Sequence, residues 1–295
     1  MDFIDDFSCM HSNSPSQKAI FTLDGIDDLL GILPQRTQNI LRARYNLDGT
    51  FSRGKTLEAI GKQYGITRER VRQVIQFALK SAREKGMDRV AGAVEALEAS
   101  LVERGGIFAK DPLFRHLGVR DLDEAGATDF LLDVSDRFCV HHPDRYVEHA
   151  VSQVTFSLAD YVAIIERIES MLTEAGSPLT LSDIARRLAE EDSSLEEGHL
   201  EAYLVSSAPI GSNPLGEWGL TKWSSIRPKS SGERAHLVLR HYKRPMHFTE
   251  IAEKINELGL SKRRSNPQTV HNELIKSPLF VLTGRGTYSL TEWQR

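Results

Sequence analysis

The sequence predicts a mainly α-helical protein with small β-wings (class α+β), in which a helix-turn-helix domain is followed by tandem winged-helix domains. Three observations predict this class. Residues 56–80 hold two amphipathic segments joined by a glycine turn. A stretch in the C-terminal half occurs twice, and its second copy ends in two β-rich runs around Gly284-Arg-Gly286. The 295 residues suffice for two or more domains of ordinary size.

The N-terminal part is expected to begin as a tail and continue as helices. Residues 1–22 are rich in Asp, Ser and Asn and lack hydrophobic periodicity, so we expect them to be flexible. A short amphipathic segment follows at 26–33. Pro34 stands where a further helix can start, because its missing N–H costs little in a first turn. The run 46–49 has turn chemistry, and we place the helix-turn-helix domain at 23–87.

Two further helices are predicted at 56–64 and 67–80. Each begins at a threonine that can cap it, Thr56 or Thr67, with a glutamate in the first turn. Apolar residues fall on one face of each segment. Because a tight turn containing Gly65 joins the two segments, they have the helix-turn-helix pattern.

The second of these helices has a polar face turned away from its apolar stripe. Its residues are Arg68, Glu69, Arg72, Gln73 and Gln76. Arginine can pair with guanine and glutamine with adenine, while glutamate can accept from cytosine, so this face fits base reading in a major groove. The alternative is an ordinary solvated helix surface.

The run from L-P-Q-R at 33 through T-L-E-A-I-G-K-Q-Y to T-R-E-R-V-R-Q-V, about 60 of the 295 residues, resembles region 4 of bacterial primary-type sigma factors. The resemblance implies a helix that reads the upstream promoter hexamer and a surface that docks on the flap of the RNA polymerase β subunit. The base contacts that it implies are those of Arg68, Glu69, Arg72 and Gln73. The DNA-phosphate contacts that it implies are those of Arg42, Arg44, Thr56, Leu57, Lys62 and Thr67.

The sequence departs from that family in two ways. No segment resembles sigma region 2, whose aromatic-rich helix opens the promoter duplex, so we do not expect a complete initiating sigma factor. Phe77 stands on the distal part of the predicted reading helix, where the family usually has a polar or basic residue. We expect Phe77 to contact protein rather than phosphate.

Two stretches of the C-terminal half align with each other. Residues 178–188 match 245–255 at an offset of 67, and 219–223 match 289–293 at an offset of 70. Each unit reads as helix, short strand, capped helix, second helix and two β-rich runs, which is the order of a winged helix. A repeat of this length predicts tandem domains rather than one large core.

The last unit, predicted at 227–295, resembles the HARE-HTH family of winged helices, which occurs in an RNA polymerase subunit, in chromatin proteins and beside restriction enzymes. The resemblance rests on P-M-x-F-T-E-I-A from 245, Gly259-Leu260, T-V-x-x-E-L-I-K from 269, and Phe280 followed by G-x-Y-x-L from 286. It implies a DNA- or polymerase-associated role without catalysis. The preceding unit is predicted at 154–226. Residues 88–153 are either a degenerate winged helix or a helical connector.

Charge is segregated along the chain. The net charge is −4, but residues 25–86 carry 12 basic and 6 acidic groups, residues 87–226 carry 11 and 25, and residues 227–295 carry 13 and 6. The two basic ends allow a nucleic-acid partner despite the negative total. In the acidic 154–226 unit, the candidate reading helix carries three glutamates that phosphate would repel: Glu196, Glu197 and Glu201. We expect a spacer or a protein-binding module there.

The last unit is a candidate for a second DNA contact. Its basic and polar residues around the corresponding helix and wing are Lys262, Arg263, Arg264, Gln268, His271, Asn272 and Arg285. The alternative is that these are ordinary solvated groups.

Other functions find no support in the sequence. There is no apolar run of transmembrane length, no secretory signal pattern and no nucleotide, hydrolase or metalloprotease motif. Cys9 and Cys139 are expected to be reduced thiols, and Cys139-x-His141-His142 lacks a second ligand cluster. We therefore expect no catalysis, metal, cofactor, small-molecule substrate or membrane partner, and a cytoplasmic location.

We interpret the chain as a bacterial or phage transcription regulator that binds double-stranded DNA in a sequence-specific way and contacts RNA polymerase. The acidic middle segment would contact a protein partner. One alternative is the DNA-recognition subunit of a restriction or phage-defence system. The other is a polymerase-binding scaffold without DNA contact.

Overall fold

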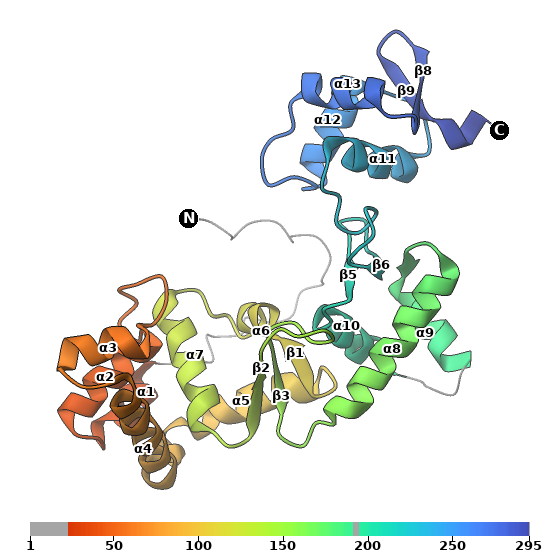
Figure 1. The fold of residues 1–295 in the computed structure, drawn as a ribbon. Helices are drawn as coiled ribbons and strands as arrows, with labels where there is room; N and C mark the ends of the chain where they lie inside the picture. Colours follow the sequence, from red (N-terminus) through yellow and green to blue (C-terminus); the bar gives the residue numbers. More distant parts are fainter. Residues whose placement is uncertain (1–22, 191–194, 295) are drawn as a thin grey trace. The chain divides into compact units, whose positions relative to one another are not determined.

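The computed structural model describes residues 23–190 and 195–294 (Figure 1). The chain divides into two compact units, with the division between Tyr161 and Val162. The tail predicted at 1–22 lies outside the described residues. None of the described helices is both long and apolar enough to cross a membrane.

The chain's first described elements are four helices. They are α1 (Leu23–Gly31), α2 (Gln35–Tyr45), α3 (Leu57–Tyr64) and α4 (Arg68–Gly86). Pro34 directly precedes α2, as its sequence position predicts, and Asn46 ends α2 in a left-handed conformation with φ of 55°. Apolar side chains from all four helices form a buried core, which includes Leu29, Leu30, Ile40, Leu41, Ile60, Val71, Ile75 and Ala78.

Helices α3 and α4 form a helix-turn-helix. The Thr56 hydroxyl accepts a hydrogen bond from the amide of Ala59 at 3.2 Å, and the Thr67 hydroxyl accepts one from the amide of Arg70 at 3.1 Å. Both threonines therefore cap their helices. Gly65 ends α3 with φ of 64°, a left-handed conformation that glycine adopts without strain.

A short 3-10 turn, η1 (Met87–Val90), leads into a small sheet with three helices. Its elements are α5 (Ala91–Val102), β1 (Ile107–Ala109), α6 (Lys110–His116), α7 (Leu122–Val134), β2 (Phe138–His141) and β3 (Ala150–Gln153). Strands β1 and β2 both pair antiparallel with β3, so the strand order is β1-β3-β2. The order helix, strand, helix, helix, strand, strand is that of a winged helix.

The same order of elements occurs twice more. The acidic repeat has α8 (Leu158–Ala175), β4 (Leu179–Thr180), α9 (Leu181–Glu190), α10 (Glu197–Val205), β5 (Ile210–Ser212) and β6 (Glu217–Leu220). The last repeat has α11 (Ser231–Tyr242), β7 (Met246–His247), α12 (Phe248–Glu257), α13 (Pro267–Lys276), β8 (Phe280–Gly284), β9 (Thr287–Leu290) and η2 (Thr291–Gln294). The strand orders, β4-β6-β5 and β7-β9-β8, are equivalent. The predicted fold class is confirmed.

The internal repeat of the sequence matches these elements closely. Helices α9 and α12 have equal lengths at an offset of 67 residues, while α10 and α13 begin at an offset of 70. The three-residue difference therefore lies between these two helices, in residues 191–196 of the acidic repeat and 258–266 of the last one. The longer loop carries the basic run Lys262-Arg-Arg264.

Candidate nucleic-acid interface

Helix α4 separates a buried face from an exposed polar face. Val71, Ile75 and Ala78 pack into the core, and the Thr67 cap aligns the first turn. The four residues predicted to read bases all lie exposed on the first two turns of α4: Arg68, Glu69, Arg72 and Gln73. The structure thus brings the whole predicted set onto one surface.

Glu69 connects the side chains of this exposed face. It accepts two hydrogen bonds from the Arg72 guanidinium, from Nε at 2.9 Å and from Nη2 at 2.6 Å. The Gln73 amide also donates to Glu69, at 3.5 Å. The hydrogen bond from Arg72 holds the pKa of the Glu69 carboxyl below its usual range. Glu69 is therefore charged at neutral pH and orients its two neighbours.

Arg70 belongs to the same surface, although it is not among the residues predicted to read bases. Its side chain is exposed, and its Nη1 donates to the amide oxygen of Gln73 at 3.3 Å. Gln73 is therefore held from both sides, by Arg70 and by Glu69. The helical spacing could have indicated this contact, because Arg70 lies three residues before Gln73 and i,i+3 neighbours meet on a helix surface.

Two of the predicted phosphate contacts, Lys62 and Thr67, lie around the turn between α3 and α4. A shallow surface recess is lined by Glu58, Gly61, Lys62, Gly65, Ile66, Thr67 and Arg68. Within it Lys62 is exposed and pairs with Glu58 at 3.2 Å. The unpaired amides at the N-terminus of α4 favour anions nearby. This end of α4 therefore combines a lysine, helix amides and the first predicted base-reading arginine.

The remaining residues predicted to contact phosphates differ in exposure and in the hydrogen bonds that they already form. Arg44 is exposed, and its Nη1 donates to the carbonyl oxygen of Lys55 at 3.2 Å. Leu57 is half-buried. The hydroxyl of Thr56 is already used as a helix cap.

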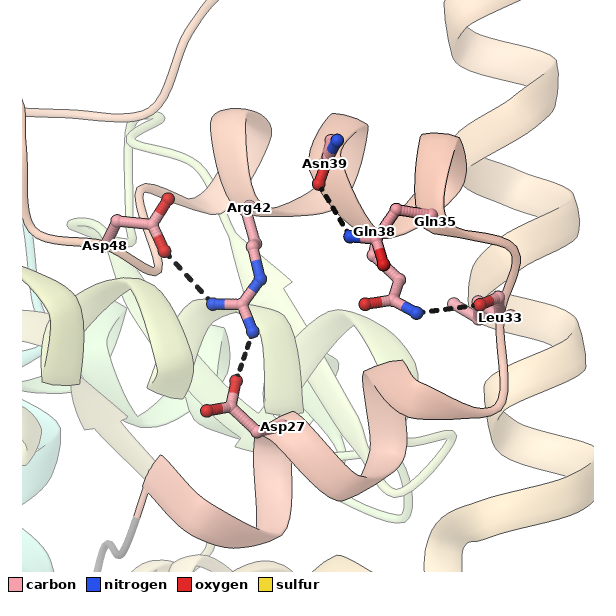
Figure 2. A network of polar contacts seen from close by, with 7 residues as sticks. All are labelled: Asp27, Leu33, Gln35, Gln38, Asn39, Arg42 and Asp48. Carbon is pink, nitrogen blue, oxygen red and sulfur yellow. Dashed lines mark hydrogen bonds and ion pairs between the residues drawn. The ribbon is translucent and has the colours of Figure 1, made fainter.

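Arg42 has an internal role that its place in the sequence does not predict. Figure 2 shows its guanidinium between two carboxylates, those of Asp27 on α1 and Asp48 after α2. The bond from Nη1 to Asp48 is 3.0 Å long. Because the guanidinium is already paired with two carboxylates of its own domain, a phosphate would have to compete with them for Arg42.

Helix α7 is largely buried against the N-terminal helices. It occupies the place in its repeat that α10 and α13 occupy in theirs, and it packs against α2 and α4 (Figure 1). Of its thirteen residues only Leu122 and Asp133 are exposed. Because seven of its thirteen residues are buried and four more are half-buried, α7 offers little free surface to a groove of DNA.

Specific bonds attach α7 to the helix-turn-helix. The Tyr45 hydroxyl donates to Asp133 at 2.6 Å, and Arg83 Nε donates to the carbonyl oxygen of Val134 at 2.7 Å. The Tyr45 ring meets the edge of Phe130, with centroids 5.3 Å apart. Burial, followed by the Asp133 carboxylate, raises the pKa of the Tyr45 phenol. The pair is therefore a neutral phenol donating to a carboxylate.

The acidic repeat presents its glutamates as expected from their positions. Glu196, Glu197 and Glu201 are all exposed at or near the N-terminal end of α10. Carboxylates there complement the helix dipole, but they repel a phosphate backbone.

The last repeat brings six of the seven predicted second-contact residues to the surface. They are Lys262, Arg263, Arg264, Gln268, Asn272 and Arg285. His271 differs, because its ring stacks on Phe248 at 4.4 Å between centroids and meets the edge of Tyr288 at 5.8 Å. Local sequence could not reveal this aromatic cluster, since its members come from three separate elements.

No metal site is found among the residues that the structure describes. Cys139 and His141 lie on β2, where the His141 ring nitrogen is 2.8 Å from the Ser152 hydroxyl. His142 instead stacks on His149, with centroids 5.7 Å apart.

Two family models match parts of the chain. Residues 29–84 match the model "Sigma-70, region 4", and residues 232–293 match the HARE-HTH model, whose description names ASXL and a restriction endonuclease HTH domain. Both resemblances indicated by the sequence are confirmed, and both families are DNA-binding helix-turn-helix types rather than enzymes. Sigma-70 region 4 is a helix-turn-helix that binds DNA and contacts RNA polymerase.

The relatives of the N-terminal region are bacterial sigma factors. The RNA polymerase principal sigma factor HrdD of Streptomyces viridifaciens is 41% identical over 96 residues, which cover 30% of this chain and 27% of that protein. HrdD of Streptomyces coelicolor is 38% identical over the same shares, and sigma factor SigA of Listeria monocytogenes is 40% identical over 28% of this chain and 21% of SigA. The chain thus spans about a quarter of the length of these relatives. No solved structure matches it.

Proposed function

We propose that this protein is a cytoplasmic transcription regulator that reads a promoter-like DNA site with the N-terminal half of α4 and contacts RNA polymerase. The observation that carries the proposal is the exposed face of α4. Arg68, Arg72 and Gln73 are exposed there, and Glu69 accepts hydrogen bonds from Arg72 and Gln73. The match of residues 29–84 to sigma region 4 supports it.

The geometry suggests how recognition works. The Arg72 guanidinium is already held in one orientation by Glu69, so less side-chain freedom is lost when it meets a base. In a major groove, Arg68 and Arg72 would donate to the O6 and N7 of guanine, and Gln73 would pair with adenine. Glu69 would stay beside Arg72 or accept from a cytosine amino group.

Phosphate contacts would fix the register of α4 on the duplex. The recess at the turn places Lys62 and the N-terminal amides of α4 where a phosphate could bind. Thr56, Thr67, Leu57 and Arg44 would lie along the same backbone, while Arg42 would act mainly inside the domain. The acidic repeat would hold a protein partner, and the polymerase β flap is the contact that the family resemblance implies.

A selection from random duplexes, followed by sequencing, would define the site. We expect a motif that resembles the upstream promoter hexamer, and an affinity that falls steeply as salt rises. Replacing Arg68, Arg72 and Gln73 together by alanine should lower the preference for that site by about tenfold or more. If the triple variant binds its best site unchanged, the proposed role of α4 is wrong.

Arg186→Ala is the matched control. Arg186 forms an i,i+3 ion pair with Asp183 at 2.6 Å, as Arg72 does with Glu69, but it lies on α9. This variant should keep both affinity and preference.

A second candidate is the DNA-recognition subunit of a restriction or defence system. The observation that favours it is the match of residues 232–293 to a family whose description includes restriction endonucleases. A selected site unlike any promoter element, together with the absence of binding to RNA polymerase, would favour this candidate. Polymerase binding without any DNA binding would instead indicate a scaffold.

A further inference from the structure

The last repeat exposes three aliphatic side chains on adjoining elements. Ile275 on α13 is 64% exposed, Leu279 in the following turn is 52% exposed, and Leu282 on β8 is 59% exposed. Helix α13 and strand β8 lie side by side (Figure 1). We call these three residues the α13–β8 strip.

Contacts within the repeat link the two ends of the strip. Leu282 lies opposite Tyr288 in the β8–β9 pairing, and the Tyr288 ring contacts His271 on α13. Ile275 follows His271 by four residues, which is one helical turn on the same face. Leu282 therefore adjoins Tyr288, and Ile275 lies one helical turn from His271, so each borders the aromatic pair.

Basic groups border the strip. Lys276 follows Ile275, and Arg285 lies in the turn between β8 and β9; both are exposed. Neither forms an ion pair with any of the described residues at 4.0 Å or less. The strip is thus an apolar surface beside uncompensated positive charge.

This surface suits a peptide better than a DNA duplex. A phosphate backbone could satisfy Lys276 and Arg285, but it would leave three large aliphatic groups in water. The ring of His271 is half-buried, stacks on Phe248 and meets the edge of Tyr288, so a base contact would cost these ring contacts. A matching partner would carry carboxylates together with large apolar side chains.

The N-terminal end of this chain has that chemistry. Residues 1–8 read M-D-F-I-D-D-F-S, with three aspartates and, in the span 3–7, three large apolar residues. We propose that the α13–β8 strip binds this segment, with Phe3, Ile4 and Phe7 on the aliphatic groups and the aspartates toward Lys276 and Arg285. This goes beyond the proposed function, which assigns the strip no ligand.

A labelled peptide tests the proposal. The probe is residues 1–8 with a fluorophore at the C-terminus, titrated into full-length protein whose own segment is disabled by Phe3→Ser, Ile4→Ser and Phe7→Ser. We expect saturable binding, seen as a rise in anisotropy. A peptide with the same three serines keeps its charge and should not bind.

Variants of the strip locate the site. Adding Ile275→Ser and Leu282→Ser should weaken peptide binding by about tenfold or more, and Lys276→Glu should weaken it as well. Because all three side chains are exposed, thermal melting followed by circular dichroism should not change. Phe77→Ser is the matched control, since Phe77 is an exposed apolar residue, 75% accessible, that lies on α4. It should leave peptide binding unchanged.

Three results would overturn the proposal. They are the absence of saturable binding, equal binding by the strip variant, and loss of binding in Phe77→Ser instead. A strip variant that loses affinity for duplex DNA while the peptide does not bind would assign the strip to DNA. The reading role of α4 is measured separately by the Arg68, Arg72 and Gln73 variant, so the two proposals can fail independently.

Discussion

At the scale of single residues, Glu69 and Tyr45 show how one side chain can organise its neighbours. Glu69 places a negative charge on a surface proposed to bind DNA, where phosphates repel it. Such a carboxylate needs a second role to be favourable. Its bonds to Arg72 and Gln73 supply that role. Tyr45 is buried and donates to Asp133, so it joins α2 to α7 through a polar bond inside an apolar contact.

Glu69→Gln should reduce specificity more than affinity. The glutamine removes a negative charge, which favours non-specific binding, and loosens Arg72, which weakens base reading. The ratio of dissociation constants for scrambled and selected duplexes should fall by about tenfold. Glu58→Gln, at the carboxylate paired with Lys62 on α3, should leave that ratio nearly unchanged. An unaltered ratio in Glu69→Gln would remove the positioning role.

Tyr45→Phe should lower the free energy of unfolding by about 1 kcal/mol at neutral pH, since it deletes a buried hydrogen bond. Burial and the Asp133 carboxylate raise the pKa of Tyr45 in the folded state above the ordinary value of about 10 for a tyrosine. Its contribution to stability is therefore fully present below pH 10 and is lost as pH rises further. The stability difference between wild type and Tyr45→Phe should shrink above pH 10 in denaturant titrations. A difference that grows there would contradict the assignment.

At the scale of elements, one helix position has three different environments. Helices α7, α10 and α13 are equivalent in the three winged-helix repeats. α7 is covered by the helix-turn-helix, α10 exposes glutamates, and α13 exposes basic, polar and aliphatic groups. The repeated topology therefore does not imply a repeated function, because function depends on the surface of each helix.

Gly126→Ala tests the close approach of α7 to the helix-turn-helix. A Cβ at position 126 would lie 1.9 Å from the carbonyl oxygen of Tyr45, so α7 would have to move away. We expect a loss of about 2 kcal/mol or more of unfolding free energy, measured by denaturant titration.

Gly92→Ala is the control for this substitution. Gly92 lies on α5, and a Cβ there would meet nothing within 4 Å. Alanine should be neutral or stabilise by up to about 1 kcal/mol, because it favours helix. Equal melting of the two variants would argue against tight packing of α7.

At the scale of the whole molecule, charge and topology are distributed separately. The winged-helix repeat occurs three times, but net charge changes sign between its copies. The segment between α12 and α13, which is three residues longer than its counterpart, contains the basic run 262–264. These positive charges lie outside the helices and strands, so they can vary without altering the core.

Deleting residues 262–264 should preserve folding. The acidic repeat has three fewer residues between its equivalent helices, so the last repeat should tolerate the same spacing. The melting temperature should stay within about 4 °C of the wild type, the shift expected from less than 1 kcal/mol. If this loop contacts phosphates, the slope of log affinity against log salt should fall by up to about 3. Loss of cooperative unfolding would show that the two loops are not equivalent.

Much of this protein could be predicted from local sequence. The caps at Thr56 and Thr67, the start of α2 after Pro34, the hairpin at Gly286 and the repeat all depend on neighbours within a few residues or on an internal comparison. The exposed face of α4 follows from helical periodicity for the same reason. These are short-range properties of the backbone and of residue type.

Only the tertiary structure determined which surfaces are engaged in contacts within the protein itself. Arg42 looks like any exposed arginine in the sequence, yet Asp27 and Asp48 pair with it. His271 looks like a polar helix residue, yet its ring packs against Phe248 and Tyr288. Helix α7 looks available in the sequence, yet it packs against α2 and α4. The physical reason is that such contacts join residues distant along the chain. Local propensity determines each element, whereas the packing of elements determines which side chains remain free to bind a partner.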